Sequence, residues 1–289
     1  MDLGMLPPYR SGIGADPAAM VALAQLAESC GVSTLYVVEH VAVAAGYADG
    51  YPYSTDGRMP LGEDCPIPDP LELIAFLSAR TSTLRFNTGV LVAPHHHPLV
   101  LAKRLVTLDC LSGGRVDVGL GIGWMREEIE STGSEFSSRG RRTTELVRAL
   151  RAALDEDPAT HDGEFFGFTD MRVHPRPSRR IRIDIGGHGE RAALRAGEVG
   201  DGLHPLALDD DTLARRWNLA RSAAEAAGRD PDSLRLTVTL PVAAIDTGAV
   251  ERMAGLGVSR IVCSTATSDP GRLAGELRRA AEVVAGVGR

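Results

Sequence analysis

The stretch from Leu84 to Trp124 constrains the fold more than any other part of the chain. It has the pattern of a strand, a helix and a second strand, and two parallel strands joined by a helix form a βαβ unit. Both strands end in glycine, with Gly89 on the first and Gly119, Gly121 and Gly123 on the second. Glycine allows the backbone to bulge or to approach a ligand closely. Two neighbouring strand ends of this kind predict one site shared between them.

Strand-like and helical patterns alternate along the whole chain. The sequence predicts eight strands, over residues 3–6, 35–38, 84–92, 116–120, 182–185, 202–206, 234–240 and 260–263. A helix is expected after each strand, over residues 17–29, 70–80, 98–111, 125–130 with 142–154, 190–198, 211–227, 249–255 and from 270 onward. Eight strand–helix units without a dividing linker predict one domain over residues 1–289. Its fold class is α/β, a (β/α)8 TIM barrel.

Two irregular segments interrupt this series. Residues 41–68 form a long loop after the second strand, rich in Gly, Pro, Tyr and Asp, and loops of this length tend to be functional. An insertion follows the fourth strand, and a small hairpin is predicted there over residues 163–173. Both segments are expected to be additions to a single barrel.

Charge and composition narrow the possible functions. The net charge of −7 argues against general nucleic-acid binding. The chain contains no run of eighteen apolar residues, so we expect no membrane span, and its first residues lack the pattern of a signal peptide. The four cysteines are widely spaced and include no C-x-x-C pair, which is typical of reduced cysteines. We therefore expect a cytoplasmic protein.

Glu39 and His40 follow the second predicted strand. Active sites of barrels of this type lie at the C-terminal ends of the strands. Neighbouring strand residues point to opposite faces, so one of the two should enter the mouth of the barrel and the other should pack outward. A histidine in the mouth is suited to proton transfer near neutral pH. The residues alone favour this function and a structural role for His40 equally.

The turn from Gly186 to Arg191 joins the fifth strand to a helix. Free N–H groups at a helix start, together with glycine, make a cradle for an anion, and Arg191 would add charge. This pattern favours phosphate binding over a purely structural turn. The segment from Gly119 to Gly123 has the spacing G-x-G-x-G, whereas a dinucleotide site needs G-x-G-x-x-G, so we do not expect a Rossmann site.

Two further clusters contain residue types that can bind ligands. His95-His96-His97 contains an H-x-H pair, which is half of a metal site, but no acidic residue follows the eighth strand to complete it. We therefore expect no metal, and we favour a solvated loop or contact with a polar part of a ligand. The basic segment 139–145 is interpreted as a solvated face with local ion pairs, with contact of Arg139 or Arg142 to an anionic ligand as the alternative.

Taken together, five segments resemble the luciferase-like flavin and deazaflavin oxidoreductases. The segments are TLYVVEH (34–40), LRFNTGVLVAP (84–94), PLVLAKRLVTLDCLSGGRVDVGLGIGW (98–124), EFSSRGRRTTE (135–145) and IDIGGHGERAALRAGEVGDGL (183–203). The last two resemble a mainly actinobacterial branch assigned to coenzyme F420, an 8-hydroxy-5-deazaflavin. The resemblance spans most of the chain and implies the same barrel fold.

The resemblance also implies roles for individual residues. It implies a non-prolyl cis peptide bond between Gly89 and Val90 that supports the redox ring, a phosphate site at the 186–188 turn, and a place for His40 beside the ring as the catalytic residue. The residues assigned to the cofactor are Glu39, Thr88, Gly89, Val90, Gly121, Gly123, Gly186, Gly187 and His188.

At position 124 the sequence differs from the sugar-phosphate dehydrogenases of this family. Those dehydrogenases carry a carboxylate where Trp124 stands, and tryptophan offers only one N–H and a large apolar face. We therefore expect a less polar substrate, such as an enone, an imine or an aromatic compound, stacked on Trp124. The 41–68 loop would cover it and supply a tyrosine, with Tyr51 as the assigned contact beside Tyr47 and Tyr53. Glu127 and Glu128 are weak candidates for a replacement acid.

The function implied by the resemblance is hydride transfer between F420 and a small organic substrate, in the reductase direction. The alternative is an FMN-dependent monooxygenase, which would need a reductase partner. A cofactor-binding protein without activity and a metal-dependent hydrolase are the remaining alternatives. The resemblance further implies a homodimer, packed through the helices at 70–80 and 98–111.

Overall fold

The computed structural model describes residues 1–48 and 50–287, and their strands form a parallel barrel. Nine strand segments make one sheet in the order β3-β2-β1-β11-β10-β9-β8-β5-β4. Their bounds are β1 (Asp2–Met5), β2 (Thr34–Val37), β3 (Arg85–Thr88), β4 (Leu91–Val92), β5 (Val118–Gly121), β8 (Ile183–Gly186), β9 (Gly202–His204), β10 (Arg235–Pro241) and β11 (Val258–Ser264). Every pairing in this sheet is parallel.

β3 and β4 are the two halves of the predicted third strand, so the nine segments count as eight barrel strands. The prediction of one continuous strand over 84–92 was wrong, because the chain leaves the sheet at Gly89–Val90, where the peptide bond is cis. The barrel closes between β3 and β5. Phe86 pairs with Val116, and Thr88 Oγ1 both donates to the carbonyl of Gly119 and accepts from its N–H. The predicted TIM-barrel fold is confirmed.

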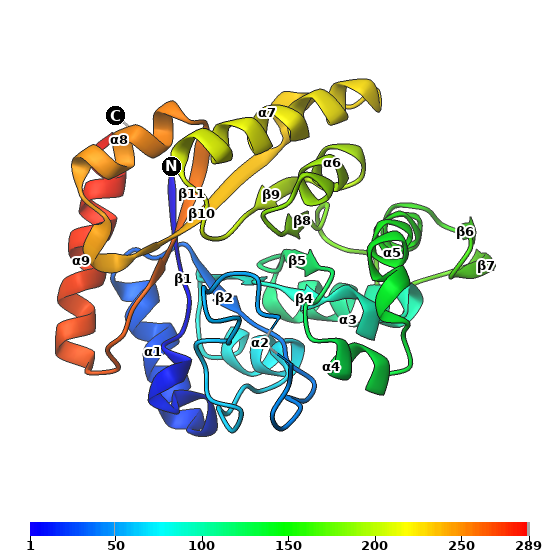
Figure 1. Cartoon of the computed structure of the whole chain (residues 1–289). Helices are drawn as coiled ribbons and strands as arrows, with labels where there is room; N and C mark the ends of the chain where they lie inside the picture. The colour runs from blue at the N-terminus through cyan, green and yellow to red at the C-terminus, as the bar shows by residue number, and fades with distance from the viewer. Residues whose placement is uncertain (49, 288–289) are drawn as a thin grey trace.

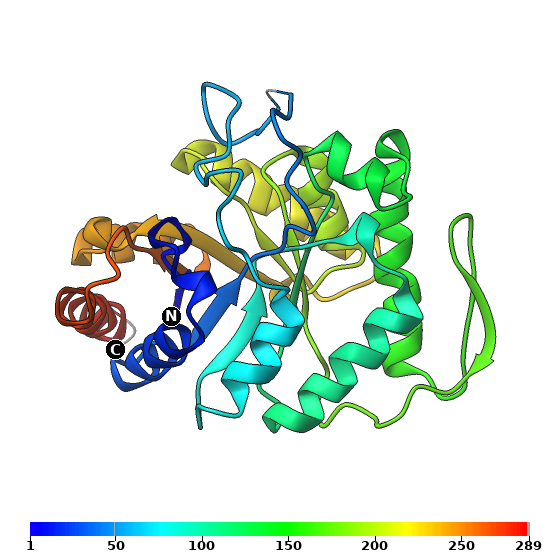
Figure 2. The ribbon, with the colours of Figure 1, turned by 90° about the horizontal axis from the view of Figure 1, so that it is seen from below.

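Helices surround the barrel, and Figures 1 and 2 show them on its outer side. They are α1 (Pro17–Ser29), α2 (Pro70–Ser78), α3 (Pro98–Ser112), α4 (Arg126–Ser131), α5 (Arg139–Asp155), α6 (Glu190–Glu198), α7 (Asp210–Ala226), α8 (Thr247–Gly255) and α9 (Pro270–Val287). Asp16 and Asp69 cap α1 and α2 as predicted, because each carboxylate accepts hydrogen bonds from N–H groups in the first turn. α5 begins at Arg139, three residues before the predicted start at 142. Among the described residues, no helix combines the length and apolarity needed to cross a membrane.

The predicted hairpin exists, but its first strand was misplaced. β6 (Ala159–Asp162) pairs antiparallel with β7 (Gly167–Met171), and the hairpin projects beyond α5 in Figure 1. Residues 163–166, the predicted start of the hairpin, form its turn. Glu145 of α5 explains this, because its carboxylate accepts hydrogen bonds from the N–H groups of Glu164, Phe165 and Phe166.

Candidate active site

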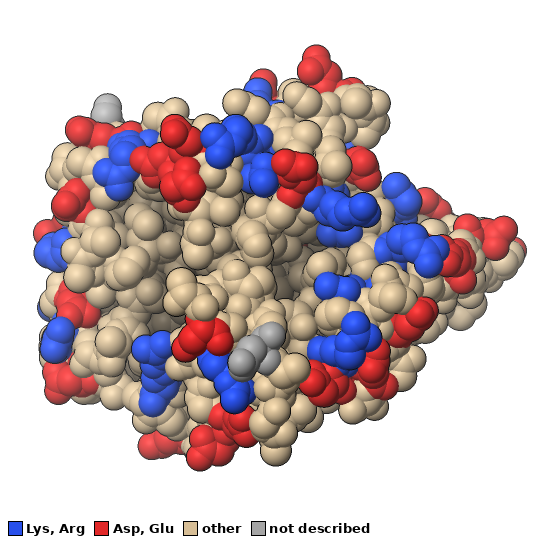
Figure 3. Space-filling view, in the orientation of Figure 1, with Lys and Arg blue, Asp and Glu red and all other residues tan. Residues whose placement is uncertain are grey.

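The predicted site residues lie at the C-terminal ends of the barrel strands. Figure 2 shows residues 41–48 and 50–68 rising on this side of the molecule, above the ends of the strands. Figure 3 looks onto the same face and shows it hollowed over the middle of the barrel. Lys and Arg side chains gather along the margin of the hollow near α5 and α6. This face is the mouth of the barrel, where catalytic groups of such barrels lie.

Val90 occupies space that glycines leave in the mouth. A Cβ atom added to Gly121 would lie 2.6 Å from Val90 Cγ2, and one added to Gly186 would lie 2.7 Å from Val90 Cγ1. A Cβ atom at Gly119 would lie 2.3 Å from the carbonyl oxygen of Thr88. The structure thus brings three strand ends together around the cis bond at Gly89–Val90, which was expected from the family resemblance.

Glycine is needed at position 123 for a different reason than at the positions around Val90. Its φ of 74° is in the left-handed region, and an added Cβ would lie 2.7 Å from Val92 Cγ1 and 2.8 Å from Ile129 Cδ1. Glycine is required here by the turn into α4 and by close packing against apolar side chains. Any contact of Gly123 with a cofactor would be made by its backbone.

Glu39 and His40 lie just beyond β2, which ends at Val37, so strand alternation does not determine where they point. The carboxylate of Glu39 is buried and accepts a hydrogen bond from the N–H of Val92 at 2.6 Å. It also contacts His96 Nε2 at 3.0 Å. Glu39 therefore holds β4, the strand that follows the cis bond, against the end of β2.

His40 is held by Glu128, a residue that the sequence suggested only as a weak acid. His40 Nδ1 lies 3.0 Å from Glu128 Oε2, and the ring meets Trp124 edge-on with a centroid distance of 6.1 Å. Burial opposes the charge on Glu128, but hydrogen bonding to His40 and the nearby imidazole of His95 outweigh it and lower the pKa of Glu128 to about 2. The suggestion of a replacement acid at Glu128 was wrong, because the group is an ionised carboxylate at neutral pH.

His95 and His96 are not part of a solvated loop, which was one of the two interpretations of this cluster. The His95 side chain is 2% exposed and its Nε2 lies 3.7 Å from Glu128, while its Nδ1 contacts Thr132 Oγ1 at 2.7 Å. The His96 side chain is 10% exposed and pairs with Glu39. Both imidazoles are buried because each has a carboxylate partner near the mouth. Within the described residues, no three His, Cys, Asp or Glu side chains are grouped to hold a metal ion.

Aromatic rings cover the mouth in a continuous series of edge-to-face contacts. Trp124 meets Tyr47 at 5.1 Å and Tyr51 at 5.2 Å, measured between ring centroids. Tyr51 meets Tyr53 at 5.3 Å, and Tyr53 meets His188 at 5.0 Å. Burial raises the pKa of Tyr53 to about 12, so its hydroxyl is neutral. The 41–68 loop therefore connects the predicted substrate contacts Trp124 and Tyr51 to the predicted phosphate turn.

The 186–188 turn has two features that suit a ligand. Gly187 has a φ of 128°, which an L side chain rarely adopts. Nδ1 of His188 is buried and has no hydrogen-bond partner among the described residues. Unpartnered buried polar atoms are uncommon in proteins, so a polar group of a ligand or a water molecule is expected at this nitrogen.

The basic segment at the start of α5 is only partly the solvated face that was predicted. Arg141 forms the expected surface ion pair with Glu164. Arg139 lies over the ring of Phe136 at 3.6 Å and Arg142 over that of Phe166 at 4.6 Å, so both guanidinium groups are packed on aromatic faces.

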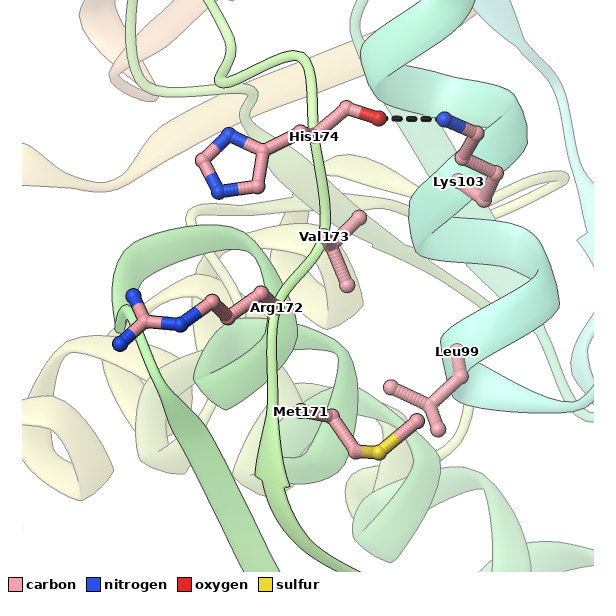
Figure 4. Close-up of a pocket in the computed structure, with 6 residues that line it drawn as sticks. All are labelled: Leu99, Lys103, Met171, Arg172, Val173 and His174. Atoms are coloured by element: carbon pink, nitrogen blue, oxygen red, sulfur yellow. Dashed lines mark hydrogen bonds between the residues drawn. The ribbon is translucent and has the colours of Figure 1, made fainter.

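A groove of about 340 Å3 lies outside the barrel, between α3 and the chain that follows β7 (Figure 4). Lys103 of α3 crosses it and donates a hydrogen bond to the carbonyl of His174. The other lining residues are Leu99, Met171, Arg172 and Val173. None of the predicted site residues lines this groove.

Known proteins resemble the chain over most of its length. The family model of luciferase-like monooxygenases matches residues 1–281. An uncharacterized protein of Mycobacterium tuberculosis is 32% identical over 256 residues, which cover 88% of each chain. The FMNH2-dependent dimethylsulfone monooxygenase of Pseudomonas fluorescens is 32% identical over 185 residues, which cover 62% of this chain and 45% of that protein.

Two solved structures share the fold at low sequence identity. The monooxygenase RslO1 from Streptomyces bottropensis has a TM-score of 0.80 and 22% identity, with all of both chains covered. An F420-dependent secondary alcohol dehydrogenase, solved with an F420–acetone adduct, has a TM-score of 0.78 and 18% identity over 99% of this chain and 98% of that one. These structural similarities support the barrel fold. The match to the family model over nearly the whole chain identifies the family. The chain belongs to the luciferase-like monooxygenase family.

Proposed function

We propose that the chain is an oxidoreductase that uses coenzyme F420 to transfer hydride between the deazaflavin and a small organic substrate. The observation that carries this proposal is the arrangement of the mouth. Gly186 lies against Val90 at the cis bond. A series of aromatic contacts runs from His40 to His188 of the 186–188 turn. This combination would provide an apolar support for a planar ring, a group that can exchange a proton, and a cradle for a phosphate.

The residues of the mouth fit a cofactor of this kind. Val90 projects over three glycine positions that no larger residue could occupy, and its side chain offers an apolar surface on which a flat ring would rest. The unpartnered Nδ1 of His188 and the left-handed Gly187 lie at the turn proposed for the phosphate.

The bound deazaflavin would supply the hydride, and its reduced form reacts poorly with oxygen. The protein would orient the substrate, exclude water and move a proton. Trp124, Tyr51 and Tyr53, whose rings contact one another in series, would stack on the substrate and keep water out of the hollow. His40 would give or take the proton at Nε2, because its Nδ1 faces Glu128.

The substrate we propose is uncharged and partly apolar, such as an enone, an imine or an aromatic compound. Tyr47, Met59 and Met125 form a small apolar cluster in this region, with Trp124 and Tyr51 packed against it. Burial raises the pKa values of Tyr51 and Tyr53, so their neutral hydroxyls would not balance the charge of an ionic substrate.

The second candidate function is an FMN-dependent monooxygenase that requires oxygen and a separate reductase. It is favoured by the 32% identity to the dimethylsulfone monooxygenase, which is FMNH2-dependent. The same support for a planar ring and the same phosphate turn would serve either cofactor.

Equilibrium titration of the purified protein with F420 and, separately, with FMN tests the proposal. Saturable binding of F420 in the micromolar range with much weaker binding of FMN is expected. The reverse preference, together with oxygen consumption in the presence of reduced FMN, would replace the proposal with the second candidate.

Replacement of His40 tests its catalytic role. His40→Ala should fold normally and lose about 100-fold or more in kcat with an accepted substrate, since general acid–base catalysis contributes about that much. His174→Ala is a matched control, because the His174 side chain is 56% exposed on the outside of the barrel. Unchanged turnover in His40→Ala would remove His40 from the mechanism.

We also propose that the protein is a cytoplasmic homodimer that packs through α2 and α3. These helices expose Phe76, Val100 and Leu111, which are 39%, 59% and 67% accessible. Light scattering of the purified protein would show the mass of a dimer, and Val100→Glu would shift it toward that of the monomer.

A further inference from the structure

We infer that Glu128 is the positioning residue of the site: it fixes which nitrogen of His40 carries the proton and anchors the start of the loop that covers the mouth. The consequence for turnover rests on the proposed function, whereas the consequence for the His40 ring does not. Glu128 lies on α4, and His40 lies 88 positions earlier in the chain.

Both oxygens of the Glu128 carboxylate are engaged. Oε2 lies 3.0 Å from His40 Nδ1, while Oε1 accepts hydrogen bonds from the N–H of Val41 at 2.6 Å and of Ala42 at 3.3 Å. The side chain is 3% exposed, so water does not compete for these bonds. A buried carboxylate with this many donors is held in one orientation.

The chemistry of a carboxylate determines the state of the His40 ring. An ionised carboxylate only accepts hydrogen bonds, so the ring nitrogen that faces it must carry a hydrogen. Neutral His40 is therefore the Nδ1–H tautomer, and Nε2 carries the lone pair. Among the described residues, Nε2 makes no hydrogen bond, which leaves it available to take a proton from a ligand in the mouth or to return one.

Two neighbouring residues keep the pair in place. Trp124 stands edge-on to the His40 ring, with an angle of 78° between the ring planes, on the side of the aromatic cover. His95 lies on the other side of Glu128, with Nε2 at 3.7 Å from Oε1. Thr132 Oγ1 donates to the carbonyl of Ile129, so it accepts from Nδ1 of His95 and fixes that ring as well.

The same carboxylate also determines where the covering loop begins. Val41 and Ala42 are the first residues of the 41–68 segment, and Oε1 of Glu128 binds both of their N–H groups. The carboxylate of Glu128 therefore holds both the ring of His40 and the first residues of the loop. A substitution that keeps an oxygen at the position of Oε1 but replaces Oε2 by a hydrogen-bond donor would separate the effect on the His40 ring from the effect on the loop.

Glu128→Gln makes this separation. The amide oxygen can keep the bonds to Val41 and Ala42, and the NH2 group then faces His40 Nδ1. Because that NH2 group donates, Nδ1 must accept, and the hydrogen moves to Nε2. Glu130→Gln is the matched control, since Glu130 lies on the same helix and, within the described part of the chain, its side chain pairs with Arg126 alone on the surface.

Two-bond 1H–15N correlation spectra of the cofactor-free protein report the tautomer of each histidine directly. The chain has eight histidines, and the His40 signals are assigned by their loss in His40→Gln. We expect the Nδ1–H tautomer in the wild type and in Glu130→Gln, and the Nε2–H tautomer in Glu128→Gln. An Nε2–H tautomer in the wild type, or an Nδ1–H tautomer in Glu128→Gln, would overturn the inference. If Glu128→Gln does not fold, the wild-type spectrum decides alone.

Kinetics with whichever cofactor binds test the catalytic consequence. Glu128→Gln should lose about 100-fold in kcat, because a reversed tautomer removes the acceptor at Nε2. KM should change much less, because the loop keeps its anchor. A rise in KM with an unchanged kcat would show that Glu128 acts on the loop alone and would overturn the positioning of His40. If neither cofactor binds, the proposed function fails, while the spectra still decide the inference about the ring.

Discussion

At the scale of single residues, the mouth depends on glycines that make room for Val90. An alanine at Gly121 would place its Cβ 2.6 Å from Val90 Cγ2, so one of the two must move. We predict that Gly121→Ala destabilises the protein by about 1–3 kcal/mol, which is typical of overpacking, and weakens cofactor binding. Urea unfolding measures the first effect and titration measures the second.

Two further variants make this prediction specific. Val90→Ala removes both γ carbons, so the double variant Gly121→Ala/Val90→Ala should lose less stability than the sum of the two single changes. Gly275→Ala is the control, because an added Cβ on this α9 glycine meets nothing within 4 Å. It should stabilise the helix by about 0.5–1 kcal/mol. Purely additive effects at positions 90 and 121 would argue against the packing described here.

The residue scale also shows what one sequence can reveal about a site. The special role of Gly89, Gly121 and Gly186 in the backbone was predictable, because glycine at the end of a strand is unusual and indicates a close approach or a turn at that position. The partners of the charged residues were not, since the pair of His40 with Glu128 spans 88 positions and that of Glu39 with His96 spans 57. Contacts over such distances leave no periodic signal, so Glu128 was mistaken for an acid and His96 for a solvated residue.

At the scale of elements, a carboxylate joins α1 to the start of β3. One oxygen of Glu28 accepts hydrogen bonds from the N–H groups of Ser82, Thr83 and Leu84 and from the hydroxyl of Thr83. Slight burial acts against the charge, but these hydrogen bonds outweigh it and lower the pKa of Glu28 to about 2. This carboxylate therefore fixes the turn that leads into the third strand.

The depressed pKa of Glu28 gives a prediction for stability against pH. Because the pKa is lower in the folded state than in the unfolded chain, its contribution is complete above about pH 4.5 and is lost as the pH falls toward 2. Glu28→Gln should destabilise the protein by about 1–2 kcal/mol at pH 7, since water screens this only slightly buried group, and by much less at pH 3. Urea unfolding at both pH values measures the difference, and a constant difference would contradict the prediction.

The covering loop is a second element whose stability can be tested separately. Trp124 contacts His40, Tyr47 and Tyr51, and an aromatic pair contributes about 0.5–1.5 kcal/mol. Trp124→Ala should therefore raise the open population of the loop by about 10-fold or more. Chymotrypsin, which cleaves after aromatic residues, should cut within residues 41–68 correspondingly faster. Phe76→Ala, on the outer side of α2, is the control and should leave the cleavage rate unchanged.

At the scale of the whole molecule, the barrel was predictable and its irregularities were not. The alternation of buried strands and capped helices, such as those after Asp16 and Asp69, repeats eight times, and a closed parallel barrel satisfies that pattern. The turn at residues 163–166 depends on a tertiary partner, the carboxylate of Glu145, and the break between β3 and β4 lies at a cis bond that only the family resemblance implied. Local sequence patterns do not show such contacts between distant residues.

Closure of the barrel makes the first and last strands neighbours, because β1 pairs with β11 along Asp2–Met5. No set of consecutive strand–helix units can leave the sheet without breaking pairings on both sides, so we predict that residues 1–289 unfold as one cooperative unit. The two tryptophans test this, since Trp124 lies at the mouth and Trp217 lies on α7. In Trp217→Phe and in Trp124→Phe, urea unfolding followed by the fluorescence of the remaining tryptophan should coincide with the loss of far-UV circular dichroism. If the fluorescence transition and the circular dichroism transition have different urea midpoints in either variant, the chain contains more than one folding unit.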